Sequence, residues 1–405
     1  MRILISGASI AGPVLAYWLT RYGFTPTVVE KAPTLRKTGG HAVDLFGPAL
    51  DVVERMGLLE RIQANKTGVE RLTMLREGNT RSVKVDLGRV FNAVSDRHLE
   101  IMRNDLSEIC YDATRDDVEY VFGDSITSVS EHGDVTFEHG EPRTFDLVIG
   151  ADGLHSNVRR LVFGTESLFT TFLGAYVAVA SVPNYLRLDS ELILHGEVGR
   201  TAGIYRARHM ADAQAVFLFR SATELDYHRR DIPRQKQLLR EAYAGAGWEV
   251  PRLLAELDQT PAFYFDSITQ LQMHTWSRGR VSLVGDAGYC PGPAVGGSTS
   301  LAVVGAYVLA GELAEADGDP VPGFRAYEDE LGDYVRGSRM FARGNAKRLI
   351  PNSHAGLWAQ ANGARLISRM PPGVIRALAK LTRKRVRPHD LVTLRDYSRH
   401  ERTQA

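Results

Sequence analysis

The sequence is poor in cysteine, in net charge and in long apolar runs, and each shortage excludes a class of protein. Two cysteines, Cys110 and Cys290, are too few and too far apart for a disulfide framework or a cysteine-based metal site, which fits a reducing cytoplasm. Lys and Arg number 49 against 48 Asp and Glu, so the net charge of +1 disfavours a strongly basic nucleic-acid-binding protein. No run of about 18 apolar residues is uninterrupted, so we expect neither a transmembrane helix nor a membrane partner.

In other respects the composition is that of a globular protein, except for an excess of glycine. The 405 residues, 44% hydrophobic and 24% charged, predict two or three domains around a large core. The apolar N-terminal run from Ile3 to Leu19 is interrupted by Ser6, Ser9 and Gly12-Pro13, so we interpret it as strand, turn and helix rather than as a signal peptide. Glycine is in excess: 38 of the 405 residues are glycine, about 9% of the chain, whereas the average share in proteins is about 7%.

The order of apolar patterns predicts an α/β protein. A strand at Ile3–Ile5, a turn, a helix over Pro13–Tyr22 and a strand at Thr27–Glu30 form a βαβ unit, the usual opening of a doubly wound sheet. From about residue 170 to 275, runs of strands predict a separate mixed or antiparallel sheet, and the rest of the chain is mainly helical. We expect a discontinuous doubly wound domain over 1–168 and 277–320, a sheet domain over 169–276, and a C-terminal helical brace over 321–405.

The N-terminal turn carries the pattern of a dinucleotide site. Gly7-Ala8-Ser9-Ile10-Ala11-Gly12 follows a strand and opens a helix, and Glu30 ends the next strand, as the dinucleotide fingerprint requires. The helix N-terminus attracts a pyrophosphate, and Glu30 can accept hydrogen bonds from a ribose. Ser9 stands where glycine is usual. The pattern alone separates neither NAD from FAD nor a cofactor site from an ordinary Gly-rich turn.

Further elements occur far along the chain in a consistent order. They are Arg36, Arg103, an Asp-Gly segment (Asp146 to Gly153, continuing to Arg160) and a Gly-Asp segment (Gly285-Asp286-Ala287, then Pro293 and Gly296-Gly297-Ser298). With the fingerprint, they resemble the flavoprotein aromatic hydroxylases of the para-hydroxybenzoate hydroxylase family, most closely its compact branch, which includes tetracycline-inactivating monooxygenases. Two positions depart from the family pattern: Gly288-Tyr289 replaces Ala-His, and Gly296-Gly297-Ser298 replaces Gly-x-Gly.

This resemblance implies non-covalently bound FAD and a monooxygenase reaction. The residues that it assigns to the cofactor are Gly7, Ser9, Ile10, Ala11, Gly12, Glu30, Lys31, Arg36, Arg103, Asp152, Gly153, Gly285, Asp286, Pro293, Gly296 and Gly297. It implies that NADPH or NADH, bound transiently, reduces the flavin, and that O₂ then forms a C4a-hydroperoxyflavin that oxygenates an aromatic or polyketide-like molecule of secondary metabolism. Because the flavin carries this chemistry, we assign no catalytic side chain and no metal.

Two alternatives stay open at this stage. One is an FAD-dependent dehydrogenase, reductase or non-redox cyclase on the same fold, and the other is a flavin-free binding protein. Candidate substrate contacts are His41, Tyr205, Arg220, Phe265 and Pro293. Aromatic faces among them can stack on a ring, and the arginine can pair with a carboxylate or phenolate; alternatively the aromatic residues are core and the arginine is exposed. We expect a cytoplasmic monomer or homodimer, and we interpret the basic cluster from Lys380 to Arg387 as a solvated helix end.

Overall fold

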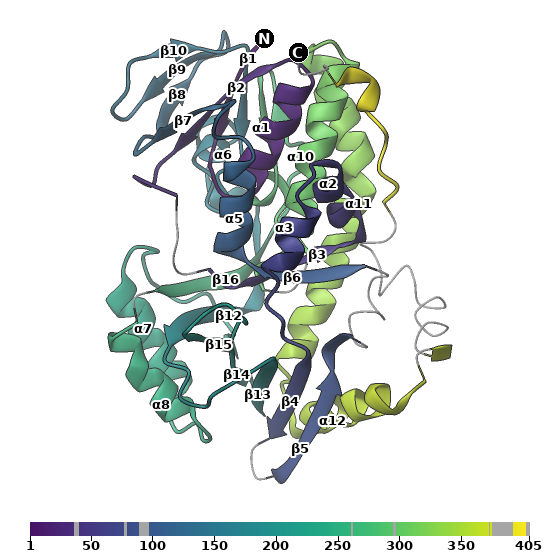
Figure 1. The fold of residues 1–405 in the computed structure, drawn as a ribbon. Coiled ribbons are helices and arrows are strands. Elements are labelled where there is room, and N and C mark those ends of the chain that lie inside the picture. Colours follow the sequence, from purple (N-terminus) through teal and green to yellow (C-terminus); the bar gives the residue numbers. More distant parts are fainter. Residues whose placement is uncertain are drawn as a thin grey trace.

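Two large sheets lie at opposite ends of the molecule and are connected by long helices (Figure 1). The computed structural model describes residues 1–35, 40–76, 79–88, 97–260, 262–294, 297–371, 373–374 and 392–401. Arg36, Gly296 and the cluster from Lys380 to Arg387 lie outside the described residues. The predicted α/β class, with a doubly wound sheet, a second sheet and C-terminal helices, is confirmed.

The first sheet is the predicted doubly wound sheet. Its strands are, in spatial order, β17 (Ser277–Arg278), β18 (Val281–Leu283), β11 (Leu147–Gly150), β1 (Arg2–Ser6), β2 (Thr25–Glu30) and β7 (Glu119–Phe122). From β18 to β7 all neighbours run parallel, and β17 pairs antiparallel at the edge. Ile3, Leu4 and Ile5 are fully buried, because a parallel sheet is covered on both faces. A small antiparallel sheet lies nearby, formed by β8 (Ile126–Val129), β9 (Asp134–Phe137) and β10 (Arg143–Thr144).

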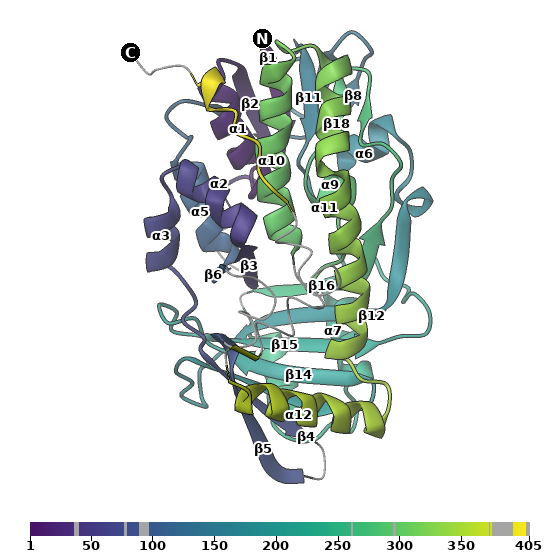
Figure 2. The ribbon, with the colours of Figure 1, turned by 90° about the vertical axis from the view of Figure 1, so that its right-hand side faces the viewer.

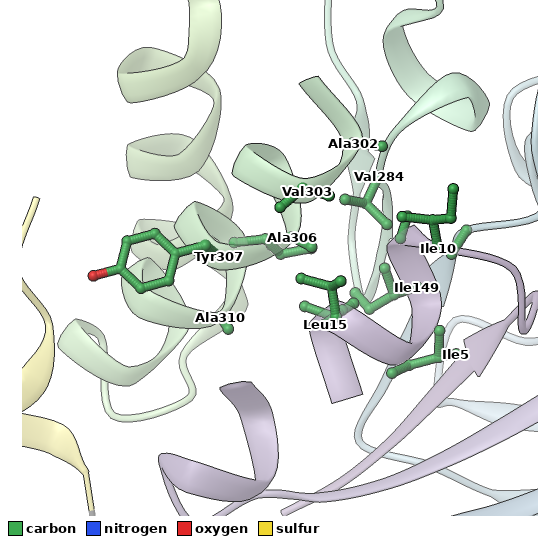
Figure 3. Close-up of a cluster of buried hydrophobic side chains, with 14 of the residues drawn as sticks. Ile5, Ile10, Leu15, Ile149, Val284, Ala302, Val303, Ala306, Tyr307 and Ala310 are labelled. Carbon is green, nitrogen blue, oxygen red and sulfur yellow. The ribbon is translucent and has the colours of Figure 1, made fainter. Parts of the chain in front are cut away.

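Helices α1 (Ala11–Arg21) and α10 (Ser298–Glu315) pack beside this sheet. In Figure 3, Leu15 of α1 lies between Ile149 of the sheet and Ala306 of α10. Ala302, Ala306 and Ala310 recur every four residues along α10, and such small side chains let two helices approach closely. Almost all of α10 is buried, which explains why its sequence is apolar on every side.

The second sheet draws strands from two parts of the chain. Its spatial order is β16 (Phe263–Leu271), β12 (Thr170–Val182), β15 (Ala213–Arg220), β14 (Arg200–Tyr205), β13 (Glu191–Glu197), β4 (Arg71–Arg76) and β5 (Asn79–Asp86). The pairing is antiparallel except between β13 and β4. Strands β4 and β5 therefore join this sheet from a stretch inside the range 1–168, which we had placed in the first domain. Helices α7 (Ile232–Ala242) and α8 (Val250–Ala255) cover one face.

The last long helices connect the two ends of the molecule. Helix α11 (Pro320–Leu349) runs beside α10 and continues to the second sheet, and α12 (His354–Arg369) lies across that sheet near β4 and β5 (Figure 2). The other helices are α2 (Gly47–Arg55), α3 (Leu59–Ala64), α5 (Arg103–Asp112), α6 (Asn157–Val162) and α9 (Asp286–Tyr289). Strands β3 (Ala42–Phe46) and β6 (His98–Met102) form an antiparallel ladder between the sheets. Within the described ranges, no helix has the length and apolar character needed to cross a membrane.

Candidate functional site

The turn between β1 and α1 is as tight as the fingerprint requires. The N–H of Gly7 donates to the carbonyl oxygen of Val29 at 2.8 Å, which fixes the turn against β2. Gly7 has φ +111°, and a Cβ at this position would lie 2.5 Å from the carbonyl oxygen of Ala151. A Cβ on Gly12 would lie 1.9 Å from the carbonyl oxygen of Gly7. Only glycine therefore fits at either position.

A cavity of about 560 Å³ lies against this turn. The cofactor residues expected from the sequence that line it are Gly7, Ser9, Glu30, Lys31, Arg103, Asp152 and Gly153. Lining residues that the sequence analysis did not select include Asp124, His155, Asn157, Arg229, Arg230 and Tyr264. The fingerprint, the N-terminus of α5 and the Asp-Gly segment, which are distant in the sequence, thus meet around one cavity.

Ser9, the departure from the fingerprint, has partners on α5. The Arg103 guanidinium donates to Ser9 Oγ at 3.3 Å, and Ser107 Oγ donates to the Ser9 carbonyl oxygen at 3.0 Å. The extra hydroxyl therefore faces a cation. Glu30, at the end of β2, accepts from the N–H groups of Ala8 and Ala32, both at 2.9 Å.

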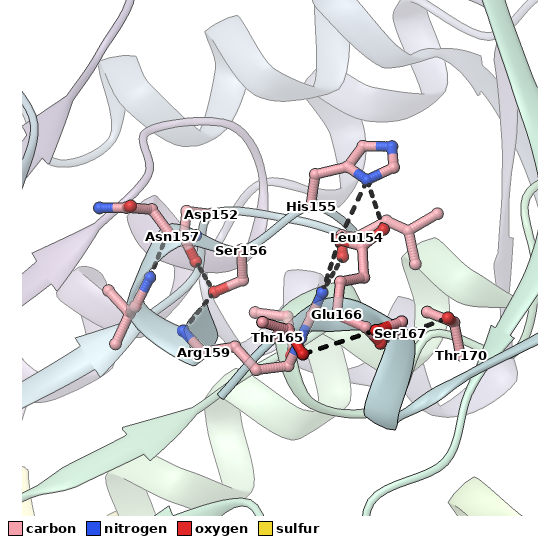
Figure 4. Close-up of polar contacts among 12 residues, drawn as sticks. Asp152, Leu154, His155, Ser156, Asn157, Arg159, Thr165, Glu166, Ser167 and Thr170 are labelled. Carbon is pink, nitrogen blue, oxygen red and sulfur yellow. Dashed lines mark hydrogen bonds and ion pairs between the residues drawn. The ribbon is translucent and has the colours of Figure 1, made fainter. Parts of the chain in front are cut away.

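The carboxylate of Asp152 holds the start of α6 (Figure 4). It accepts from the N–H groups of Asn157 at 2.8 Å and Val158 at 3.1 Å, and from Ser156 Oγ. Burial raises the pKa of Asp152 despite these bonds. Asp152 therefore shapes the wall of the cavity and, at the same time, caps a helix.

Arg159 connects the two distant cofactor segments. This side chain is 1% exposed and donates to the carbonyl oxygens of Leu154 at 2.6 Å and Ala287 at 2.9 Å, and to Glu166 Oε2 at 2.9 Å. Leu154 follows the Asp-Gly segment, whereas Ala287 belongs to the Gly-Asp segment. Arg159 lies in the stretch that continues from Gly153 to Arg160, but the family resemblance assigns it no role.

His155 lies between two carboxylates at the wall of the cavity. Its Nδ1 is 2.9 Å from Glu166 Oε1, and its Nε2 is 3.4 Å from Asp266 Oδ2 (the Glu166 contact is drawn in Figure 4). Burial alone would lower the pKa of His155, but the hydrogen bonds and ion pairs with Asp266 and Glu166 outweigh it and raise the pKa to about 9. His155 is therefore a cation at neutral pH, and it links the first sheet to β16 of the second.

The Gly-Asp segment follows β18, directly beside the Asp-Gly segment. β11 and β18 are parallel neighbours, and the N–H of Val284 donates to the carbonyl oxygen of Gly150 at 2.9 Å. Ser298 Oγ donates to Asp286 at the start of α10. Ile10 and Ala11 are buried, and Ala11 packs against Gly285: a Cβ on Gly285 would be 3.3 Å from the Cβ of Ala11.

The end of the Gly-Asp segment leads into α10. Gly297, with φ +88°, precedes the first turn of α10, and no side chain caps this helix. Pro293 is half-buried in the loop before it. None of Gly285, Asp286, Pro293 and Gly297 lines the 560 Å³ cavity.

The expected substrate residues are split between different places. The His41 ring centroid is 5.3 Å from that of Tyr264, and burial, together with Arg103, lowers the pKa of His41 to about 4. The hydroxyl of the buried Tyr205 accepts from the N–H of Ala42 at 2.8 Å. Both residues thus lie at the boundary between the first cavity and the second sheet.

Arg220 and Phe265 are placed away from the cavity. Arg220 Nε donates to the carbonyl oxygen of Ile350 at 2.6 Å, just after the end of α11, so its guanidinium binds a helix end. Its role toward a substrate stays a prediction. Phe265 is buried in an aromatic core under α7 and α8, 5.1 Å between ring centroids from Tyr227. Tyr264, the neighbour of Phe265 on β16, points to the opposite face and lines the cavity.

The described residues fit the FAD that the sequence resemblance implies. No side chain caps the N-terminus of α1, so its first N–H groups are left for an anion such as a pyrophosphate. Glu30 supplies carboxylate oxygens for ribose hydroxyls, and Arg103 and Lys31 supply positive charge. Glycine at positions 7 and 12 lets the turn close tightly, because a Cβ at either position would collide with a backbone carbonyl oxygen. Among the described residues, no group of three or more His, Cys, Asp or Glu side chains is arranged to hold a metal ion.

Comparisons with known proteins agree with this site. A family described as "FAD binding domain" matches residues 1–330. An uncharacterized protein of Mycobacterium tuberculosis strain H37Rv is 45% identical over 347 residues, covering 85% of this chain and 93% of that protein. A flavin-dependent monooxygenase from an unknown prokaryotic organism is 41% identical over 343 residues, covering 84% of this chain and 88% of that protein. The crystal structure of the tetracycline destructase Tet(51) is similar with a TM-score of 0.81 at 34% identity, over 98% of this chain and 99% of that one.

Proposed function

Because the chain belongs to the FAD-binding-domain family of flavoprotein monooxygenases, we propose that it uses NADPH or NADH and O₂ to oxygenate an aromatic or polyketide-like small molecule. Binding of FAD and monooxygenase activity on a small molecule follow from the family itself. The reductant and the substrate class are the proposed parts. The observation that carries the proposal is the single cavity that joins the fingerprint turn, Arg103 and the Asp-Gly segment.

The residues of this cavity and of the Gly-Asp segment have distinct proposed roles toward FAD. The N-terminus of α1 faces the pyrophosphate, with Ser9 and Arg103 beside it, and Glu30 accepts from the adenosine ribose. Asp286, at the start of α9, accepts from the ribityl chain. The chemistry that FAD supplies when bound is the acceptance of a hydride from a reduced nicotinamide and the activation of O₂.

The N-terminus of α10 is proposed to face the flavin ring. Gly297 leaves the first N–H groups of α10 without a capping side chain, and their partial positive charge stabilises an anionic group placed there. Ser298 already donates to Asp286, so one residue couples the helix start to the ribityl contact. His41, which contacts the cavity residue Tyr264, is uncharged at neutral pH because its pKa is lowered to about 4.

Substrate is proposed to bind between the second sheet and the ladder of β3 and β6. Tyr205 is buried at that boundary, and its hydroxyl holds β3 through Ala42. The similarity to a tetracycline destructase over nearly the whole chain supports polyketide-like candidates. The division into domains over 1–168 with 277–320, 169–276 and 321–405 stays a prediction, as does the monomeric or homodimeric state.

A turnover assay tests the proposed reaction. FAD-loaded protein is mixed with NADPH or NADH and a panel of aromatic and polyketide compounds, tetracycline included, under isotope-labelled O₂. We expect at least one compound to stimulate nicotinamide oxidation and to gain one labelled oxygen atom. If no compound in a broad panel becomes labelled, the proposed substrate class is wrong.

The variant Asp286→Ala tests the proposed ribityl contact. We expect it to lose FAD during gel filtration, because a hydrogen-bond acceptor beside Ser298 is removed. Asp116→Ala is the matched control, since the Asp116 side chain is 88% exposed on the surface. Equal flavin absorbance per protein in both variants would remove Asp286 from the site.

The two cysteines support the proposed cytoplasmic location. Cys110 and Cys290 are free and buried, as expected where thiols stay reduced.

A further inference from the structure

A second cavity, of about 990 Å³, lies apart from the first. It is framed by β6, by the segment that leads into β4, by the end of β5 and by Ser368 of α12 (Figure 1 shows these elements). No residue lines both cavities. Its size is in the range of a pocket for a drug-sized molecule.

One carboxylate at this cavity lacks a cation. Thr67 Oγ1 donates to Glu100 Oε2. Glu100 Oε1 has no hydrogen-bond partner in the described part of the chain, and Glu100 lines the cavity. Within the same residues, no Lys, Arg or His forms an ion pair with Glu100.

The surroundings of Glu100 make a bound cation favourable. Asp44 is directly opposite Glu100 in the ladder of β3 and β6, and like charges in that position repel. Asp44 itself is 2.8 Å from His98 Nε2. Burial and then the neighbouring Asp44 raise the pKa of Glu100 to about 7, although the Thr67 hydrogen bond and the nearby His98 act in the opposite direction. Tyr205 is a further titratable group near Glu100.

Apolar residues form another part of the wall of this cavity. Val85, Leu87 and Leu99 are each at most 9% exposed and line the cavity together with Val69. Exposed charged residues of both signs also line the cavity: Lys66, Glu70, Arg71, Lys84 and Asp86. Glu70 is 3.6 Å from Arg208. A ligand with an apolar part and one basic group can contact both these apolar residues and Glu100.

One strand connects this cavity to the proposed flavin site. His41, just before β3, contacts Tyr264 of the first cavity, and Ala42 binds the hydroxyl of Tyr205. Two residues further, Asp44 faces Glu100 of the second cavity. A molecule bound at Glu100 is thus next to the boundary where we placed the substrate.

We propose that the second cavity binds the basic group of an amphipathic cationic molecule, with Glu100 as its counter-charge, and that this molecule is the substrate class. The binding part stands on the cavity alone, whereas the assignment as substrate rests on the proposed function.

The test compares a cation with its neutral parent. Aminacrine, a cationic aminoacridine, and acridine, which is neutral at about pH 8, have the same ring system. Their binding to the FAD-loaded full chain is measured by isothermal titration calorimetry without reduced nicotinamide. The variants are Glu100→Gln, which keeps the shape and an acceptor for Thr67, and Glu131→Gln, the matched change at an exposed turn that lines neither cavity.

We expect Glu100→Gln to weaken aminacrine binding by about tenfold or more, because a charge-assisted hydrogen bond contributes about 1.5–3 kcal/mol. Acridine binding should be unchanged, and Glu131→Gln should bind both probes like the wild type. Equal aminacrine affinity in wild type and Glu100→Gln overturns the proposal, and so does the lack of saturable aminacrine binding to the wild type.

Two readouts keep the result decisive. If Glu100→Gln does not fold, the wild type alone decides: a preference of about tenfold for aminacrine over acridine supports the proposal, and equal affinities overturn it. Because no turnover is measured, failure of the monooxygenase assay would leave this binding result standing. Binding of aminacrine that fails to compete with a turned-over substrate would overturn only the substrate assignment.

Discussion

Replacing Arg159 by methionine tests whether one buried guanidinium holds the two cofactor segments together. Methionine keeps much of the apolar stem and removes every donor. The change leaves the carbonyl oxygens of Leu154 and Ala287 without their partner, and Glu166 keeps only His155. Because the lost contacts join the Asp-Gly segment to the Gly-Asp segment, both stability and FAD retention should fall.

The size of the effect follows from burial on each side of the ion pair. Breaking a fully buried pair costs about 3–5 kcal/mol. Arg159 is 1% exposed, but the Glu166 side chain is 38% exposed, so water partly solvates the carboxylate that is left. Arg159 Nε also has no partner within the described residues, so the native arrangement already carries an unsatisfied donor. We therefore expect about 3 kcal/mol, the lower end of that range.

The neighbouring arginine provides the control. Arg160 is exposed and donates to Asn157 Oδ1 at 2.6 Å, so Arg160→Met should cost less than about 0.5 kcal/mol. Urea unfolding of FAD-free protein measures stability, and flavin absorbance after gel filtration measures retention. Arg159→Lys should recover little, because an ammonium cannot reproduce the fork of donors. If Arg159→Met and Arg160→Met have equal stability and equal FAD retention, the contacts of Arg159 between the two segments contribute to neither property.

Two further predictions concern the turn and the cation at the cavity. Gly12→Ala should abolish FAD retention, because its Cβ would lie 1.9 Å from the Gly7 carbonyl oxygen. Gly57→Ala, with φ +73° and nothing within 4 Å of its Cβ, should cost only about 1 kcal/mol and keep the flavin; a fully yellow Gly12→Ala protein would contradict the steric argument. His155→Gln should flatten the pH dependence of the melting temperature, since a pKa raised from about 6.5 to about 9 gives stabilisation that is complete below pH 6.5 and is lost as the pH rises through 9. Parallel curves for wild type and variant would show that the ion pairs of His155 contribute nothing.

Local patterns were predictable from the sequence because they depend on residues close together in the chain. The fingerprint turn, α1 and the strands of the first sheet form where spacing and apolar runs predicted them. The distant segments were found through resemblance, and the structure brings the Asp-Gly segment to the fingerprint turn.

Contacts between distant segments were not predictable. The sequence predicts Arg220 as a cation on a strand. Its hydrogen bond to the carbonyl oxygen of Ile350 depends on where α11 ends in space, which the sequence does not reveal. The pairing of β4 with β13 joins segments that no local pattern connects. Alternate residues of β16 point to opposite faces, but the sequence does not determine which face α7 and α8 cover. It therefore cannot distinguish Phe265, which packs in the core, from Tyr264, which lines the cavity.

Ser9 shows how a departure from a family pattern gains meaning from its neighbours. A side chain close to a phosphate site normally obstructs the approach of the anion, which is why glycine is usual there. Here Ser9 Oγ accepts from Arg103, and Ser107 holds the Ser9 carbonyl oxygen. The arginine is therefore fixed beside the turn before any cofactor arrives, and less side-chain entropy is lost on binding. Ser9 departs from the usual sequence pattern, but its hydroxyl orients Arg103 beside the turn where the pyrophosphate is proposed to bind.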